Sequence, residues 1–114
     1  MSFCYINGFY KNNIDAQISV EDRGFNFSDG VYEVMSFRSG KLLNFDKHSD
    51  RLSKSLMDLQ ISKPFRNPNS LKIIIYHLLK LNDVNDGFLY LQITRGTAKR
   101  NHLFPGNIKP NIVI

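Results

Sequence analysis

The sequence of 114 residues contains one cysteine, no tryptophan and only four prolines. Because Cys4 has no partner, the chain forms no internal disulfide and offers no cluster of thiolates to a metal, so we expect a reducing, cytoplasmic setting. No apolar run approaches the roughly 20 residues that cross a bilayer, and the N-terminus lacks the pattern of a secretory signal. We therefore expect no membrane partner.

Several motifs that mark common enzyme classes are also missing. The sequence contains no HExxH pattern, no paired Cys motif, no GxSxG turn and no glycine-rich phosphate loop with a lysine. Enzymes that use a metal ion or a nucleophilic serine are poorly supported, and we predict no metal site.

The charge of the chain is moderately basic, with a formal net charge of +5. Such a charge is compatible with binding to nucleic acid, an anionic membrane face or acidic small molecules. The basic residues are scattered, and the densest group is Lys99, Arg100 and His102. A solvated surface with one local anion site is favoured, while a basic nucleic-acid-binding module is the rival. That rival predicts retention on heparin or DNA that weakens steeply with salt.

The composition is that of one ordinary globular domain. Hydrophobic residues make up 42% of the chain and include nine Phe and five Tyr, which is enough to build a core without staples. Neither an internal repeat nor a low-complexity linker divides the sequence. We therefore treat residues 1–114 as a single domain.

The N-terminal half predicts short strands joined by tight turns. Asn7-Gly8 is typical of two-residue hairpin turns, and Ser39-Gly40 precedes a second hairpin strand. The strands expected around these turns, together with one further extended piece, cover residues 3–6, 9–10, 17–20, 31–38 and 41–45.

Two amphipathic helices follow, each indicated by apolar residues at helical spacing. Asp46 is expected to cap the first helix, and Asn69 or Ser70 the second, which follows a connection over residues 64–68. The two apolar stripes consist of Leu52, Leu56 and Leu59, and of Leu71, Ile74, Ile75, Leu78 and Leu79.

The strand expected over residues 88–94 is apolar on both faces, which favours a central position, and a further strand begins within residues 109–114. The order of elements predicts an α+β fold, with a mainly antiparallel sheet and two helices on one face. The chain stops in an apolar strand, Ile112-Val113-Ile114, that needs a partner on either side. We therefore expect that further sequence once followed it.

The loop after the central strand carries the most specific chemistry. Arg100 and His102 are two residues apart, so an extended backbone directs both side chains to one side. A guanidinium fork and an imidazole donor together suit a compact carboxylate. The alternative is that both are ordinary surface residues of the loop.

Two further residues are candidates for binding. Arg51 lies near the start of the first helix, where free backbone amides favour an anion such as phosphate, although an ion pair with Asp46, Asp50 or Asp58 is the alternative. Tyr32 either directs its phenol into a pocket or is a half-buried core residue of its strand.

These residues belong to segments that resemble the fold type IV pyridoxal-phosphate enzymes. This family includes D-amino acid aminotransferase, branched-chain aminotransferase and aminodeoxychorismate lyase. Five segments agree in order and spacing: Tyr5-Ile6-Asn7-Gly8, Ser19 to Gly24, Phe27 to Val34, His48 to Leu52, and Thr94-Arg95-Gly96 with Arg100, His102, Phe104 and Pro105.

The last segment is similar to D-amino acid aminotransferases, so the resemblance implies D-alanine-like amino acids and 2-oxo acids as substrates. It implies that Tyr32, Arg100 and His102 bind the α-carboxylate of the substrate, and that Arg51 contacts the phosphate of pyridoxal phosphate. Because the arginine and histidine of the family act across a subunit interface, it also implies a homodimer.

The chain departs from the family in one respect. The family's lysine that bonds to pyridoxal phosphate lies in a C-terminal domain, and none of the nine lysines here matches it. The resemblance thus implies an N-terminal small domain with no catalytic residue, inactive alone or completed by a separately encoded C-terminal half. A relative of branched-chain aminotransferase or of aminodeoxychorismate lyase, and a remnant without a role, are the alternatives.

Overall fold

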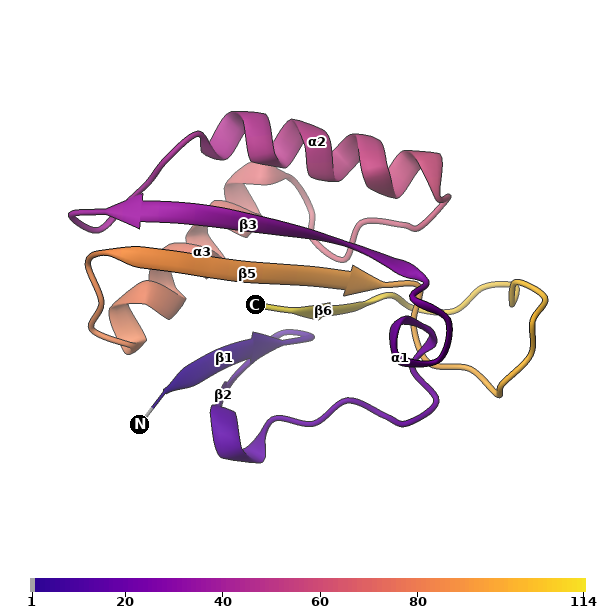
Figure 1. Cartoon of the computed structure of the whole chain (residues 1–114). Coiled ribbons are helices and arrows are strands. Elements are labelled where there is room, and N and C mark those ends of the chain that lie inside the picture. Colours follow the sequence, from indigo (N-terminus) through magenta and orange to yellow (C-terminus); the bar gives the residue numbers. More distant parts are fainter. Residues whose placement is uncertain (1) are drawn as a thin grey trace.

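The computed structural model describes residues 2–114, which form one six-stranded sheet and three α-helices (Figure 1). In chain order the elements are β1 (Phe3–Ile6), β2 (Phe9–Asn12), the 3-10 turn η1 (Asn13–Asp15), α1 (Arg23–Phe27), β3 (Gly30–Arg38), β4 (Lys41–Leu42), α2 (Phe45–Asp58), α3 (Pro68–Leu81), β5 (Gly87–Thr94) and β6 (Asn111–Val113).

The sheet has the order β2-β1-β6-β5-β3-β4, and every neighbouring pair is antiparallel. The predicted α+β class is confirmed. β5 lies between β3 and β6, as its apolar sequence predicts, and it pairs with β3 from Gly30 opposite Thr94 to Phe37 opposite Gly87. These two strands form the long centre of the sheet.

The helices α2 and α3 bury one face of the sheet, and in Figure 1 α2 runs above β3 while α3 lies behind the strands. Alternate strand residues meet the helices in a single core, because successive side chains of a strand point to opposite faces. The most deeply buried members are Met35, Leu52, Leu56, Leu71, Ile75, Leu91, Ile93 and Ile112. None of the helices within residues 2–114 is both long and apolar enough to span a membrane.

The opposite face of the sheet is left open although it is largely apolar. Its central part is formed by four exposed side chains of β3 and β5: Tyr32, Val34, Phe88 and Tyr90. Tyr32 and Tyr90 lie against each other, with ring centroids 5.9 Å apart. We call these four residues the open face.

The start of α2 differs from the prediction. The helix begins at Phe45 with Asn44 as N-cap, and Asp46 lies inside its first turn rather than at the cap. Asn44 has a left-handed backbone with φ of 56°, which Asn tolerates better than most residues. The turn ends the strand early, so the expected strand over 41–45 is limited to Lys41–Leu42. At the other end, Leu59 terminates the helix and is exposed.

The cap of α3 was also placed wrongly. Asn67 accepts a hydrogen bond from the backbone N–H of Ser70, with N···O 2.9 Å, so neither Asn69 nor Ser70 is the cap. Pro68 follows at the first helical position, where a missing N–H costs nothing. The predicted apolar stripe of α3 is confirmed, with Leu71, Ile75, Leu78 and Leu79 buried.

A short helix, α1, was missed, and the extended piece expected over residues 17–20 forms no strand. The carboxylate of Asp22 caps α1 by accepting from the N–H groups of Gly24 and Phe25 at 2.8 and 3.2 Å. Asp22 is itself held from far along the chain, since Thr94 and Asn111 donate to its other oxygen. Figure 1 shows that α1 and the loop between β5 and β6 lie at the same end of the sheet.

Candidate functional site

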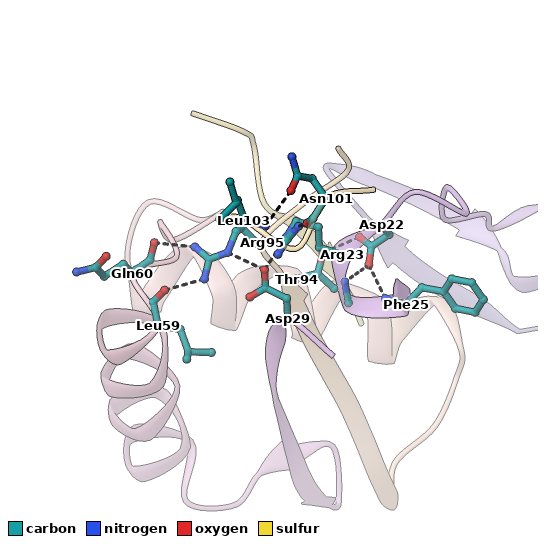
Figure 2. A network of polar contacts seen from close by, with 11 residues as sticks. Asp22, Arg23, Phe25, Asp29, Leu59, Gln60, Thr94, Arg95, Asn101 and Leu103 are labelled. Atoms are coloured by element: carbon teal, nitrogen blue, oxygen red, sulfur yellow. Dashed lines mark hydrogen bonds and ion pairs between the residues drawn. The ribbon is translucent and has the colours of Figure 1, made fainter. Parts of the chain in front are cut away.

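The candidate site lies at this end of the sheet, where α1, the start of β3 and the loop over residues 95–110 meet (Figure 2). The Asp29 carboxylate is the centre of the polar network there. One of its oxygens, Oδ2, accepts from Nε of Arg23 at 2.8 Å and from Nε of Arg95 at 2.7 Å. All three side chains are largely buried, so the network fixes α1 against the loop.

The Asp29 carboxyl stays ionised despite its burial. Burial alone would raise its pKa, but the hydrogen bonds and charges of Arg95 and Arg23 outweigh that effect and lower the pKa below its ordinary value. Two cations surround one anion, so the network keeps a net positive charge.

The two arginines have different second partners. Arg23 donates through Nη1 to the backbone carbonyl of Asn101 at 2.8 Å. Arg95 donates to the carbonyls of Leu59 and Gln60 at 2.8 and 3.2 Å, at the C-terminal end of α2. Figure 2 shows both sets of contacts. Arg23 therefore ties α1 to the middle of the loop, and Arg95 ties the base of the loop to α2.

Arg100 and His102 come together around a single aromatic ring. The Arg100 guanidinium lies 5.2 Å from the centroid of the Phe27 ring, and the His102 ring lies 5.4 Å from it. Both residues are exposed, so their donors are accessible to a ligand. Phe27 is not among the residues predicted for the site from the sequence. The signal for it was its position in the aromatic segment before Asp29.

Tyr32 does not belong to this group within one chain. It lies on the open face and is 64% exposed, so its alternative role as a half-buried core residue was wrong. Among residues 2–114, no hydrogen bond, ion pair or ring contact joins Tyr32 to Arg100 or His102. The structure thus assembles two of the three expected carboxylate ligands.

Arg51 forms a bidentate ion pair with Glu33 of β3. Its Nε lies 2.9 Å from Oε2 and its Nη2 lies 2.8 Å from Oε1 of Glu33. The partners considered from the sequence, Asp46, Asp50 and Asp58, were therefore wrong, and Asp58 pairs with Lys54 instead. Only the fold reveals Glu33, because it is 18 positions away on the sheet.

Glu33 is buried, with 4% of its side chain exposed, and it also contacts Nδ1 of His48 at 2.7 Å. Burial opposes its ionisation, but the hydrogen bonds of Arg51 and His48 outweigh this and lower its pKa. The Arg51 side chain is 66% exposed, and its Nη1 makes no hydrogen bond within residues 2–114. An oriented guanidinium with a free, accessible edge fits the phosphate group of a cofactor.

The lysines of the chain do not have the environment expected of a lysine that bonds covalently to such a cofactor. A lysine that bonds covalently to a cofactor is activated by a desolvated pocket. In residues 2–114 no lysine is buried, and Lys72, the only half-buried one, lies over the ring of Phe45. The free edge of Arg51 is therefore suited to a phosphate group, whereas no lysine of residues 2–114 lies in a desolvated pocket of the kind that a covalently bound cofactor needs.

The predicted site residues do not line the apolar cavity of the chain. A mostly apolar cavity of about 640 Å³ lies between β1, β5 and α3, and it is lined by Leu78, Val84 and Phe88 among others. Neither Tyr32, Arg51, Arg100 nor His102 lines it. The candidate site is therefore an open surface in the single chain.

Comparison with known proteins identifies the family. The family described as Amino-transferase class IV matches residues 30–114, and the chain belongs to this family. It is 37% identical over 114 residues to the D-alanine aminotransferase of Staphylococcus haemolyticus, and 38% identical over 106 residues to that of Bacillus licheniformis. These matches cover 99% and 93% of this chain. The chain spans only about 40% of the length of these relatives.

Solved structures share the fold. The branched-chain amino acid aminotransferase of Escherichia coli has a TM-score of 0.90 at 14% identity, and covers 98% of this chain and 38% of its own. The 4-amino-4-deoxychorismate lyase of Pseudomonas aeruginosa has a TM-score of 0.72 at 23% identity, and covers 96% of this chain and 37% of its own. Both likenesses confirm the predicted fold, the N-terminal domain of class IV aminotransferases.

Proposed function

We propose that this chain is the substrate-binding N-terminal part of a D-amino acid aminotransferase that exchanges amino groups between D-alanine-type amino acids and 2-oxo acids. The observation that carries the proposal is the pair of exposed side chains with hydrogen-bond donors, Arg100 and His102, gathered around Phe27. The similarity to D-alanine aminotransferases over nearly the whole chain supports the same substrate class.

In this proposal the two side chains bind the substrate's α-carboxylate. Arg100 presents a planar fork that matches two carboxylate oxygens, and His102 adds a further donor. Within residues 2–114 Tyr32 contacts the ring of Tyr90 and neither Arg100 nor His102, so we propose a homodimer in which its phenol completes the group across the interface. The exposed apolar side chains of the open face support such an assembly.

We propose pyridoxal phosphate as the cofactor, with its phosphate held by Arg51. When bound, this cofactor carries the amino group between substrates and stores the electrons released at the reacting carbon. Glu33 holds the Arg51 guanidinium in place from the sheet, which leaves the outer edge free for the phosphate. Residues 1–114 then form one N-terminal domain, and the lysine that anchors the cofactor comes from a C-terminal domain.

It follows that the chain alone is inactive, and that a separately encoded C-terminal half is one way to complete the site. We propose a cytoplasmic setting, since the single cysteine, Cys4, is buried and unpaired. A nucleic-acid-binding module is disfavoured, because Arg23, Arg51 and Arg95 pair with carboxylates of the chain rather than forming a free basic patch.

The proposal is tested by titrating the isotope-labelled chain with D-alanine and following the side-chain NMR signals of Arg100 and His102. We expect both to shift together, and an Arg100→Ala variant to lose the His102 shift. A chain in which neither side chain responds at tens of millimolar D-alanine would contradict the carboxylate role. Incubation with pyridoxal phosphate, D-alanine and 2-oxoglutarate should give no pyruvate, and steady turnover would refute the inactivity of the chain alone.

A further inference from the structure

The segment that carries Arg100 and His102 lies in a long loop without regular structure between β5 and β6. Its backbone has one long-range hydrogen bond between these two residues: the carbonyl of Asn101 accepts from Nη1 of Arg23 at 2.8 Å. Figure 2 shows this contact reaching across from α1. Because Asn101 lies between Arg100 and His102 in the sequence, the position of its peptide group constrains the positions of the Cα atoms of both neighbours.

Arg23 is itself held firmly. It is 3% exposed, its Nε pairs with Asp29 at 2.8 Å, and its backbone N–H donates to the carbonyl of Gly96 at 2.8 Å. Its guanidinium also lies 4.6 Å from the centroid of the Phe27 ring. Asp29, Asn101 and Phe27 thus hold the buried guanidinium from three sides, and the backbone of Arg23 is fixed as well, so the loop is anchored to a well-held side chain.

The Phe27 ring links this anchor to the site. Three side chains lie near the centroid of this ring: the guanidinium of Arg23 at 4.6 Å, that of Arg100 at 5.2 Å and the ring of His102 at 5.4 Å. A cation over an aromatic face is attracted by the negative charge of that face. The ring therefore attracts the Arg100 guanidinium and contacts the His102 ring at a place that the buried Arg23 side chain defines.

We propose that Arg23 is the positioning residue of the carboxylate site, and that its hydrogen bond to Asn101 fixes the relative placement of Arg100 and His102. Arg23 does not touch the substrate. The carboxylate role of the two side chains rests on the proposed function, whereas the anchoring of the loop does not.

Arg95 supplies a matched control. It pairs with the same oxygen of Asp29 at 2.7 Å, and its guanidinium lies over an aromatic ring of the loop, that of Phe104, at 4.6 Å. Its remaining donors reach Leu59 and Gln60 and not Asn101. An Arg95→Lys variant thus perturbs the same ion-pair network, but it leaves the anchor between Arg100 and His102 in place.

The experiment compares the full chain with its Arg23→Lys and Arg95→Lys variants by amide hydrogen exchange and by D-alanine titration. In Arg23→Lys we expect exchange of the Leu103 amide, which donates to the Asn101 side chain, to rise, and D-alanine affinity at Arg100 and His102 to fall, each by about tenfold or more, the order of one hydrogen bond from a charged donor. In Arg95→Lys we expect amide exchange to become faster near residues 59–62 and the affinity for D-alanine to stay unchanged.

Unchanged exchange of the Leu103 amide in Arg23→Lys, or an equal effect of both variants on that amide, would overturn the inference. If Arg23→Lys does not fold, NMR of the wild-type arginines decides: rotation about the Cζ–Nη bonds should be slow for Arg23 and fast for the exposed Arg66, and fast rotation at Arg23 would overturn the proposal. If the wild-type chain fails to respond to D-alanine while the exchange results hold, the proposed function fails and only the anchoring of the loop by Arg23 stands.

Discussion

Glu33 and Arg51 form a bidentate ion pair that joins the buried face of β3 to the exposed side of α2, with N···O distances of 2.9 and 2.8 Å. The carboxylate is buried and the guanidinium is mostly exposed. The pair therefore has a fixed inner end and an outer end that remains available to a ligand. An arginine oriented in this way is suited to phosphate, because little of its freedom is left to lose on binding.

Replacing Glu33 should destabilise the chain moderately. In Glu33→Gln the Arg51 and His48 contacts lose their charged acceptor, and we expect the free energy of unfolding to fall by about 1–2 kcal/mol, since Arg51 is largely solvated. Urea denaturation measures this. The control is Asp58→Asn, which removes an exposed pair with Lys54 and should change stability by less than about 0.5 kcal/mol. Equal effects of the two substitutions would contradict a special role for Glu33.

Asp29 and Glu33, whose carboxyls are both paired with arginines, should make stability fall in acid. The pKa values of Asp29 and Glu33 are lowered in the folded chain, so the unfolded chain binds more protons below the ordinary carboxyl range. Their stabilisation is complete above about pH 5 and is lost as the pH falls through about 4 towards the folded values.

Urea unfolding at a series of pH values from neutral to strongly acidic tests this. The double variant Asp29→Asn, Glu33→Gln should show a flatter dependence on pH than the wild type. If the two curves run parallel, the acid sensitivity arises elsewhere.

Removing the charge of Asp29 alone should cost more than removing Glu33. In Asp29→Asn both Arg23 and Arg95 keep their charge in a largely buried place without an anion, and we expect a loss of about 3 kcal/mol. Thermal and urea unfolding measure the loss. A change below about 1 kcal/mol would show that water replaces the carboxylate at little cost.

The base of the loop should tolerate no side chain at Gly96. Its φ is +127°, and an added Cβ would collide with the carbonyl oxygen of Lys109. Gly96→Ala should therefore destabilise the chain by a few kcal/mol, roughly the sum of the backbone strain of alanine at this φ and the cost of displacing the Lys109 carbonyl. Gly106→Ala, in the same loop, meets no atom within 4 Å and should be nearly neutral. The difference in urea midpoint between the variants is the readout.

The open face should drive self-association. Light scattering of the purified chain is expected to show dimers or larger species, because contiguous apolar side chains are left in water. Phe88→Ser should weaken association, whereas Ile73→Ser, on the outer side of α3, should not. The two residues are 75% and 70% exposed, so the comparison is matched for the exposed fraction of an apolar residue. A stable monomer at high concentration would contradict the expected homodimer.

Periodicity was sufficient to predict the long elements. The stripe from Leu71 to Leu79 and the two-faced strand 88–94 depend on local spacing, and both are confirmed. The helix α1 was not predicted, because a helix of five residues is too short to show a hydrophobic periodicity. Its N-cap, Asp22, is oriented by a hydrogen bond from Thr94, which is 72 positions away in the sequence. Asn44 was missed as a cap because a left-handed backbone, not a side-chain bond, starts α2.

The sequence was sufficient to propose candidate residues for the site, but not to predict which residues they contact. The spacing of Arg100 and His102 suggested that they act together, and the fold brings both to one ring. Neither Phe27 nor the partner of Arg51 follows from spacing, because both contacts bridge separate elements. The carboxylate role of Arg100 and His102 and the placement of Tyr32 beside them remain predictions, and the latter requires a second copy of the chain.

The most direct measurement uses a chimaera in which residues 1–114 replace the matching segment of the Staphylococcus haemolyticus D-alanine aminotransferase. We expect it to transaminate D-alanine with 2-oxoglutarate, and Arg100→Ala to raise the KM for D-alanine by about a hundredfold, the order of a lost arginine–carboxylate contact. A folded chimaera that is inactive, or whose KM is indifferent to Arg100→Ala, would contradict the assignment of this chain as the part that holds the substrate's carboxylate.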